Sequence, residues 1–184
     1  MIRPATPADA PAISRLIVLA MGPLAAKFAN SDDPAKPLEL FERFAKLTGN
    51  QYSYTNILVW DEQGEAVGMI MAYDGARLNE LRKPFLDYTR TQLGFTGTPE
   101  DETQPGEYYI DCLAVDPDQQ GKGIAKKLFM ALFERAAELG HSTVGLLVSK
   151  GNDKAKKLYN NLGFEEQGEK RLLGGTHYHL QKKL

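Results

Sequence analysis

A short turn in the second half of the chain reads VDPDQQGKGIA, from Val115 to Ala125. A strand-like apolar segment ends at Val115, and Pro117 prevents that strand from continuing. Two glycines, Gly121 and Gly123, precede an amphipathic helix, and glycine lets a bulky anion approach the backbone closely. The first N–H groups of a helix lack internal partners and lie at the positive end of its dipole. The turn therefore has the features of a phosphate or pyrophosphate site.

Three lysines add positive charge around this turn: Lys122, Lys126 and Lys127. The turn is not a Walker A loop, because no Gly-Lys-Ser/Thr ends it. It is not a Rossmann fingerprint either, since three correctly spaced glycines are missing. Taken alone, it fits an ordinary strand-turn-helix connection as well as a binding site, so the neighbouring elements must decide.

Strands and helices alternate on both sides of the turn. After residue 106 we expect a strand over 108–115, a helix from 124 that ends at Gly140, a strand over 143–149, a short helix over 153–162 and final strands from 164 and over 176–180. Before it we expect a strand over 2–4, a helix capped by Thr6 and Asp9, a helix over 38–47 and a hairpin of strands 55–60 and 66–73. This alternation favours an α/β or α+β domain.

Residues 74–106 break the regular pattern. Apolar residues between Leu78 and Leu93 indicate a helix, and we expect Pro84 to interrupt it. A polar loop with two prolines follows over 94–106. A connection of this length is often functional or mobile.

Length, composition and net charge exclude several other classes of protein. The 184 residues suit one domain over 1–184, with 42% hydrophobic and 25% charged residues. A net charge of −2 lacks the basic excess of a general nucleic-acid binder. No apolar run approaches the roughly 20 residues of a membrane span, and the N-terminus has no signal-peptide core. One cysteine, Cys112, excludes an intrachain disulfide and fits a reducing cytoplasm.

Four motifs together resemble the GCN5-related N-acetyltransferase (GNAT) superfamily. They are the pattern Gln120-x-x-Gly123-x-Ala125, the preceding strand Leu113-Ala114-Val115-Asp116-Pro117, the block Asn152-x-x-Ala155-x-x-x-Tyr159, and the opening Ile2-Arg3-Pro4-Ala5-Thr6-Pro7-Ala8-Asp9. The resemblance implies a GNAT-type fold, with a mixed, mostly antiparallel sheet whose fourth and fifth strands splay apart between flanking helices. It implies transfer of an acetyl group from acetyl-coenzyme A to a primary amine, by direct attack in a ternary complex, without a metal.

The resemblance also implies a set of coenzyme-binding residues. Backbone N–H groups from Gly121 to Lys126 would hold the pyrophosphate, and the backbone of Leu113 and Val115 would pair with the pantetheine arm. The N–H of Leu113 would also polarise the acetyl carbonyl. The whole set is Leu113, Ala114, Val115, Gln120, Gly121, Lys122, Gly123, Ile124, Ala125, Lys126, Asn152, Ala155 and Tyr159.

The catalytic acid implied by the resemblance is Tyr159, a phenol that would protonate the departing thiolate. Helix packing is the alternative for this ring, because it shares a helix face with Ala155. Asn152 would bind the pantetheine region, and it also suits the N-cap of the helix that begins at Asp153. Both roles are compatible.

Candidates for the catalytic base lie on the strand before the turn. Asp111, Tyr109 and Glu107 alternate, so we expect them on one face, with Cys112 as a small core residue on the opposite face. Asp111 interrupts an apolar run, and we expect burial to raise its pKa. The alternatives are a hydrogen-bonded structural carboxylate or a base that acts through water.

Several questions stay open at this stage. His177 and His179 share a strand face, and exposed strand histidines are favoured over a metal pair because no third ligand is in pattern. Rival functions are the use of another acyl-coenzyme A donor and a non-catalytic coenzyme sensor. We expect residues 74–106 to cover an acceptor site for a small-molecule or peptide amine, which Tyr52, Tyr54 and Tyr73 either line or simply pack beside. A homodimer is left open.

Overall fold

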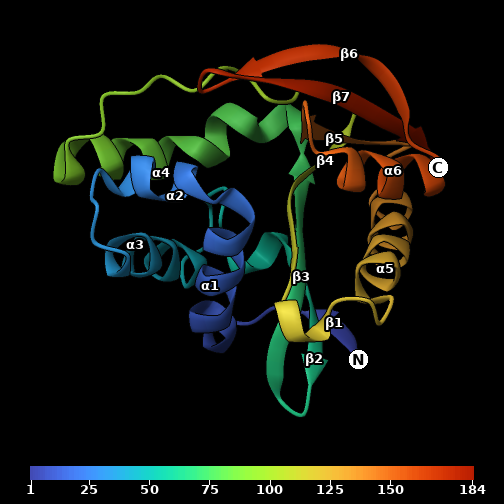
Figure 1. Ribbon diagram of the computed structural model, residues 1–184, viewed down its shortest axis with the longest axis horizontal. Coiled ribbons are helices and arrows are strands. Elements are labelled where there is room, and N and C mark those ends of the chain that lie inside the picture. The colour runs from blue at the N-terminus through green and yellow to red at the C-terminus, as the bar shows by residue number, and fades with distance from the viewer.

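Seven strands form one open sheet in the computed structural model, which describes residues 1–184 (Figure 1). Their order across the sheet is β1-β2-β3-β4-β5-β7-β6, and only the β4–β5 pair is parallel. The strands are β1 Ile2–Pro4, β2 Ile57–Glu62, β3 Glu65–Asp74, β4 Tyr108–Val115, β5 Thr143–Ser149, β6 Glu165–Leu172 and β7 Gly175–Lys183. The expected mixed, mostly antiparallel sheet is confirmed.

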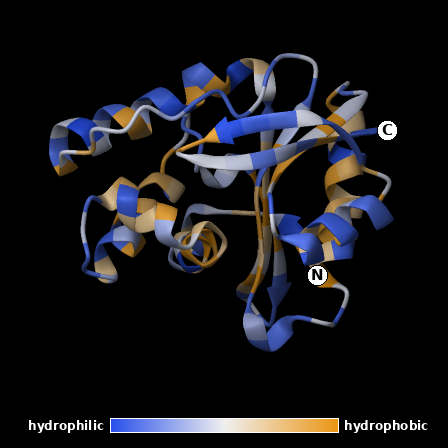
Figure 2. Ribbon diagram, turned by 45° about the horizontal axis from the view of Figure 1, so that its top comes forward, coloured by the Kyte–Doolittle hydropathy of each residue, from blue (hydrophilic) through white to orange (hydrophobic).

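Six α-helices cover the two faces of the sheet. They are α1 Ala10–Met21, α2 Pro23–Ala29, α3 Ala35–Ala45, α4 Leu78–Leu93, α5 Ile124–Glu138 and α6 Asp153–Asn161. Figure 1 shows α1 to α4 on one side of β3 and β4, and α5 and α6 on the other. Two large apolar clusters fill the spaces between the sheet and these two groups of helices. Figure 2 shows the hydrophobic residues of α1 and the central strands gathered in this interior.

Helix α5 illustrates why the sequence pattern predicts these elements well. Its buried residues recur at helical spacing, and Leu128, Phe129 and Leu132 are almost fully enclosed. Burial of each such side chain contributes about 1.5–3 kcal/mol. Gly140 follows the helix with a φ of +85°, which glycine adopts without strain and other residues rarely do. The position of α5 sets where its N-terminus meets the turn after β4.

The two central strands separate after a short contact. Strand β4 pairs with β5 only over Tyr108 to Ile110, opposite Val144 to Leu146. Beyond that point β4 stays paired with β3, while β5 continues along β7 as far as Ser149. The second half of β4 therefore has one unpaired edge, as the splayed central strands of the GNAT resemblance imply.

A β-bulge at Asp111 corrects one expectation about the faces of β4. Met71 lies opposite Cys112 and the next residue, Ala72, lies opposite Ile110, so Asp111 has no partner on β3. A bulge breaks the strict alternation of side chains. Cys112 packs in the cluster that contains Phe28 and Tyr52, and Asp111 faces a pocket lined by the same two rings. The prediction that Cys112 lies on the opposite face from Asp111 is therefore wrong.

The first half of the chain holds two further differences. Helix α2 was not expected, and the second expected helix, over 38–47, is α3 at Ala35–Ala45. Helix α4 continues through Pro84 instead of breaking there. An interior proline costs about 3 kcal/mol. Burial of Leu81, Phe85 and Leu86 at about 1.5–3 kcal/mol each exceeds that cost.

The remaining expectations for the first half hold. Strands β2 and β3 form the expected antiparallel hairpin, and Thr6 and Asp9 form the expected capping box. The carboxylate of Asp9 also pairs with Arg3 at 2.8 Å, which joins β1 to the start of the helical layer. No single helix is long and apolar enough to cross a membrane, although the segments Pro7–Met21 and Pro23–Ala29 together reach that length and composition across a bend of 115°.

Candidate active site

The turn between β4 and α5 presents a row of free backbone donors. None of the N–H groups from Gly121 to Lys126 donates a hydrogen bond within the chain, and the first bond of the helix runs from Lys127 to Gly123. Gly121 and Gly123 have φ values of +79° and +76°. A Cβ built on either glycine would meet no atom within 4 Å, so the space above the turn is open. Free donors at the positive end of a helix suit a pyrophosphate.

The free edge of β4 continues from this turn. The N–H of Asp116 donates to Val67 on β3, and successive residues of a strand alternate in direction. The N–H groups of Val115 and Leu113 therefore point to the opposite edge, which β5 leaves unpaired. We call this unpaired edge of β4, at Leu113 and Val115, the slot. Gln120 lies at the end of the slot next to the turn, because its Nε2 donates to the Val115 carbonyl at 3.2 Å. The side chain of Ala114 is turned into the core, and by the same alternation its N–H points toward β3.

Helix α6 brings Asn152 and Tyr159 to the other side of the slot. Asn152 caps the helix, since its Oδ1 accepts from the N–H of Ala155 at 3.1 Å. The Tyr159 ring packs edge-on against Phe129 and Phe164, with centroids 5.8 and 6.1 Å away. Its hydroxyl makes no hydrogen bond within the chain, so the ring packs while the oxygen stays available.

The pKa of Tyr159 is raised to about 12, chiefly by burial and further by the nearby Cys112 thiol. The phenol therefore keeps its proton throughout the neutral range. A phenol that stays protonated can donate to an anion that forms beside it, but it cannot serve as a base there.

Asp111 forms the centre of a buried polar group on the other face of β4. Its Oδ2 accepts from Gln51 Nε2 at 2.6 Å and from the Tyr73 hydroxyl at 2.8 Å. The same Gln51 amide donates to Glu102 Oε1 at 3.0 Å, and the Tyr109 hydroxyl donates to Glu102 Oε2 at 3.3 Å. Two carboxylates thus share one amide donor.

Both carboxylates hold their protons more tightly than usual. Burial raises the pKa of Asp111, as expected from the sequence, against the opposing effect of its hydrogen bonds from Gln51 and Tyr73. Burial and the charge of Asp111 raise the pKa of Glu102 to about 8. Two like charges so close to each other disfavour the ionisation of both carboxyl groups at once. Glu102 lies in the polar loop after α4, where no sequence pattern distinguished it.

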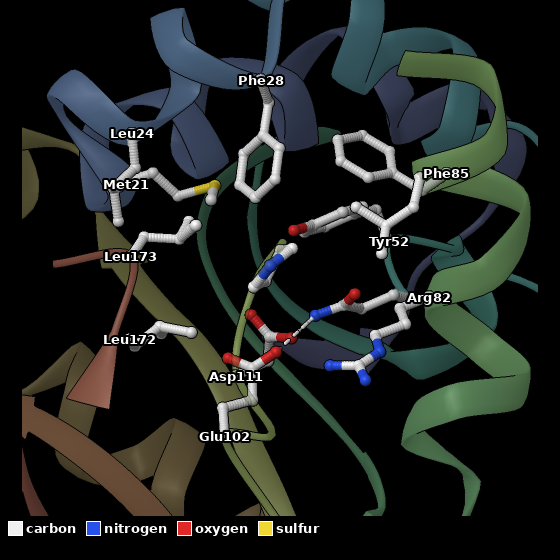
Figure 3. A pocket seen from close by; sticks show the side chains of 13 residues that line it. Met21, Leu24, Phe28, Tyr52, Arg82, Phe85, Glu102, Asp111, Leu172 and Leu173 are labelled. Carbon is white, nitrogen blue, oxygen red and sulfur yellow. Dashed lines mark hydrogen bonds between the residues drawn. The ribbon is translucent and has the colours of Figure 1, made fainter. Parts of the chain in front are cut away.

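These carboxylates lie at the inner end of a narrow pocket of about 40 Å³, room for about three water molecules (Figure 3). Figure 3 shows apolar side chains around the rest of the cavity, with Phe28 and Leu24 from α2 and Leu172 and Leu173 from the β6–β7 turn. The lining residues are Met21, Leu24, Phe28, Gln51, Tyr52, Arg82, Phe85, Leu86, Pro99, Glu102, Asp111, Leu172 and Leu173. Residues 74–106 contribute five of them: Arg82, Phe85, Leu86, Pro99 and Glu102.

Glu107 lies in a separate buried cluster. Its Oε2 meets His179 Nε2 at 2.8 Å and Gln181 Nε2 at 2.7 Å, and its Oε1 accepts from Thr103 at 2.6 Å. Hydrogen bonds from these three side chains outweigh the effect of burial and lower the pKa of Glu107. The cluster fastens the loop after α4 to β7. Glu107 does not line the pocket that Asp111 faces.

The histidines of β7 differ from the expectation of an exposed pair. His179 is buried against Glu107, and His177 is half-buried with its Nδ1 enclosed and without a hydrogen-bond partner. The reason for the burial of His179 is that the Glu107 carboxylate, which Thr103 of the loop after α4 also holds, packs against its ring. No group of three or more His, Cys, Asp or Glu side chains is arranged to hold a metal ion.

Two features of the structure adjoin at one point of β4. One is the slot with the free turn at its mouth, and the other is the pocket with Asp111 at its end. Asp111 and Leu113 are two residues apart, which is about 7 Å along a strand. A group bound along the β4 edge and a group bound in the pocket can therefore meet there.

Comparisons with known proteins find relatives in both sequence and fold. A family model described as the acetyltransferase (GNAT) family matches residues 21–164. An N-acetyltransferase structure from Staphylococcus aureus Mu50 has a TM-score of 0.84 at 26% identity, over 99% of this chain and 100% of that one. A second acetyltransferase structure has a TM-score of 0.82 at 29% identity, over 100% and 98% of the two chains.

A longer relative shares only part of its length with this chain. The mycothiol acetyltransferase of Gordonia bronchialis is 35% identical over 97 residues, which is 53% of this chain and 27% of that protein. The match therefore covers less than a third of that relative, and the acceptor in its name is the acceptor of that protein.

Proposed function

This chain belongs to the GNAT family of acetyltransferases, and from that premise we propose that it moves an acetyl group from acetyl-coenzyme A to a primary amine. Both substrates are bound together and the amine attacks directly. The observation that carries the proposal is the meeting of two sites on β4: the slot along its free edge and the pocket that ends at Asp111.

The chain's own residues suit coenzyme A along the slot. The unpaired N–H groups from Gly121 to Lys126 would hold the pyrophosphate. The free edge at Leu113 and Val115 would hydrogen-bond the amide groups of the pantetheine arm as an added strand does. Bound coenzyme supplies the activated acetyl thioester. The Leu113 N–H would then donate to its carbonyl oxygen, where negative charge develops.

Asp111 is the proposed base. An amine arrives as an ammonium ion and must lose a proton before it can attack. The ionised carboxylate of Asp111 would accept that proton, and its raised pKa brings it closer to that of a useful base. Glu102 accepts a hydrogen bond from the same Gln51 amide and so helps to keep that amide in place beside Asp111.

Tyr159 is the proposed acid for the departing thiolate. Its phenol lies near Cys112 of β4, stays protonated at neutral pH and has a hydroxyl without a partner in the chain. Glu107 is assigned a positioning role instead of proton exchange, since His179, Gln181 and Thr103 occupy its carboxylate.

Thiol release tests the proposal. Purified protein is mixed with acetyl-coenzyme A or succinyl-coenzyme A and a panel of primary amines, and free coenzyme A is measured over time. We expect amine-dependent release with the acetyl donor. Faster release with succinyl-coenzyme A would show that the protein prefers a succinyl donor. Binding of acetyl-coenzyme A without any release would favour a coenzyme sensor.

A further inference from the structure

The acceptor pocket has a chemical character that narrows its substrate. Apolar side chains form its walls, among them Leu24, Phe28, Phe85 and Leu173. Charged groups stand only at one end, where Glu102 and Asp111 lie side by side (Figure 3). A cation at that end followed by an apolar stem matches this distribution of charge.

The one lining cation is already paired. Arg82 contacts Asp101 Oδ1 and Asn79 Oδ1, each at 2.5 Å, and donates to the Glu100 carbonyl at 3.3 Å. A carboxylate on the acceptor would therefore find no free positive partner in the pocket. In an α-amino acid that carboxylate is two bonds from the amine, so it would lie beside Asp111 and be repelled by it.

Peptide groups would fare poorly for a different reason. Gln51 Nε2 already serves Tyr73, Glu102 and Asp111. The Tyr52 hydroxyl has no partner in the chain and can hold one polar group. A peptide N-terminus brings an N–H and a C=O in each residue, and a buried polar group without a partner is costly.

The small volume of the pocket limits branching next to the amine. A cavity of about 40 Å³ admits an unbranched CH₂–NH₃⁺ head more readily than an α-carbon with two substituents. Pro99 of the loop after α4, Leu172 at the end of β6 and Leu173 in the β6–β7 turn also line the cavity. The stem would run outward between them and α2.

We propose that the acceptor is a small primary amine on an unbranched apolar chain, without a carboxylate or peptide group next to the amine. This inference rests on the proposed function, because it names the acceptor of that same site. Asp111 and Glu102 bind the ammonium head, and the walls from α2, α4 and the β6–β7 turn bind the chain.

Matched acceptors separate the alternatives. Pentylamine and norleucine differ only by the α-carboxylate, norleucinamide replaces that group by a neutral amide, and norleucyl-glycinamide represents a peptide N-terminus. With acetyl-coenzyme A and thiol release, we expect kcat/KM for pentylamine to exceed that for norleucine at least about 100-fold. Equal or better turnover of any of the other three would overturn the inference but leave the acetyltransferase proposal standing.

Chain length supplies a second readout. Each methylene buried from propylamine to pentylamine should raise kcat/KM about fourfold in the wild type. Leu24→Asn, in the half-buried wall on α2, should shrink that increment. Leu19→Asn, on the neighbouring helix with Leu19 47% exposed and outside the pocket, should not. If kcat/KM did not rise with chain length, or if the two variants had equal effects, the proposed binding of an apolar chain by these walls would be wrong. No release with any amine would instead overturn the proposed function and this inference with it.

Discussion

Gly123→Ala probes the pyrophosphate turn, with Gly140→Ala as a matched control. The two glycines flank the same helix, with φ values of +76° and +85°, and a Cβ on either would meet nothing within 4 Å. A non-glycine residue in the left-handed region costs about 1–2 kcal/mol. For a protein of this size that lowers Tm by about 2–8 °C. Both variants should show this loss and keep the fold.

Only Gly123→Ala should weaken coenzyme A. If the turn relaxes to relieve its strain, at least one N–H moves away from the pyrophosphate. A hydrogen bond to a charged group contributes about 1.5–3 kcal/mol, so the Kd measured by calorimetry should rise about 10- to 100-fold. Gly140→Ala, at the far end of α5, should bind as the wild type does. Equal affinity in the two folded variants would refute the role of the turn.

Three further changes test other parts of the account. Tyr159→Phe should lower kcat about 10²- to 10⁴-fold with little change in coenzyme affinity, and full turnover would make the ring a packing residue only. The pKa of Glu102 is raised from 4.5 to about 8 in the folded protein, so between these pH values the folded protein keeps a proton on Glu102 that the unfolded chain has lost. The contribution of Glu102 to stability is therefore fully present below pH 4.5 and is lost as pH rises through 8. Denaturant titrations should therefore show wild type losing stability relative to Glu102→Gln between these values, and parallel curves would contradict the shift. Gly145→Ala should lower the free energy of unfolding by about 1–3 kcal/mol or more, because its Cβ would lie 2.1 Å from the buried Glu107 carboxylate. An unchanged Tm would show that the Glu107 side chain can move aside at no cost.

Much of the fold follows from local patterns in the sequence. Strand β4, helix α5 with its stop at Gly140, strand β5 and helix α6 all lie within a residue or two of their expected bounds. Each has a strong apolar period and a clear terminator, so local propensity and tertiary packing agree there.

The misses have a common cause in tertiary structure. Pro84 disfavours a helix locally, but burial of Phe85 and its neighbours overrides it. The bulge at Asp111 depends on the register with β3, which no local pattern encodes. His179 is enclosed because it contacts Glu107, which lies 72 residues away in the chain.

The candidate site divides in the same way. The turn at Gly121 and Gly123 and the block at Asn152 and Tyr159 carry recognisable motifs. Glu102 carries none, because its role arises from a loop folded against Asp111 and Gln51, which are far away in the chain. A polar residue in a polar loop gives no sign of burial.

The most direct measurement is the mass of the product formed from acetyl-coenzyme A and the best amine of the panel, compared between the wild type and Asp111→Asn. The account predicts an N-acetylated amine from the wild type. It predicts a rate at least about 100-fold lower from Asp111→Asn, whose amide cannot take the ammonium proton, with coenzyme affinity unchanged. Absence of acetylated product from a wild-type protein that binds acetyl-coenzyme A, or an undiminished rate from Asp111→Asn, would contradict it.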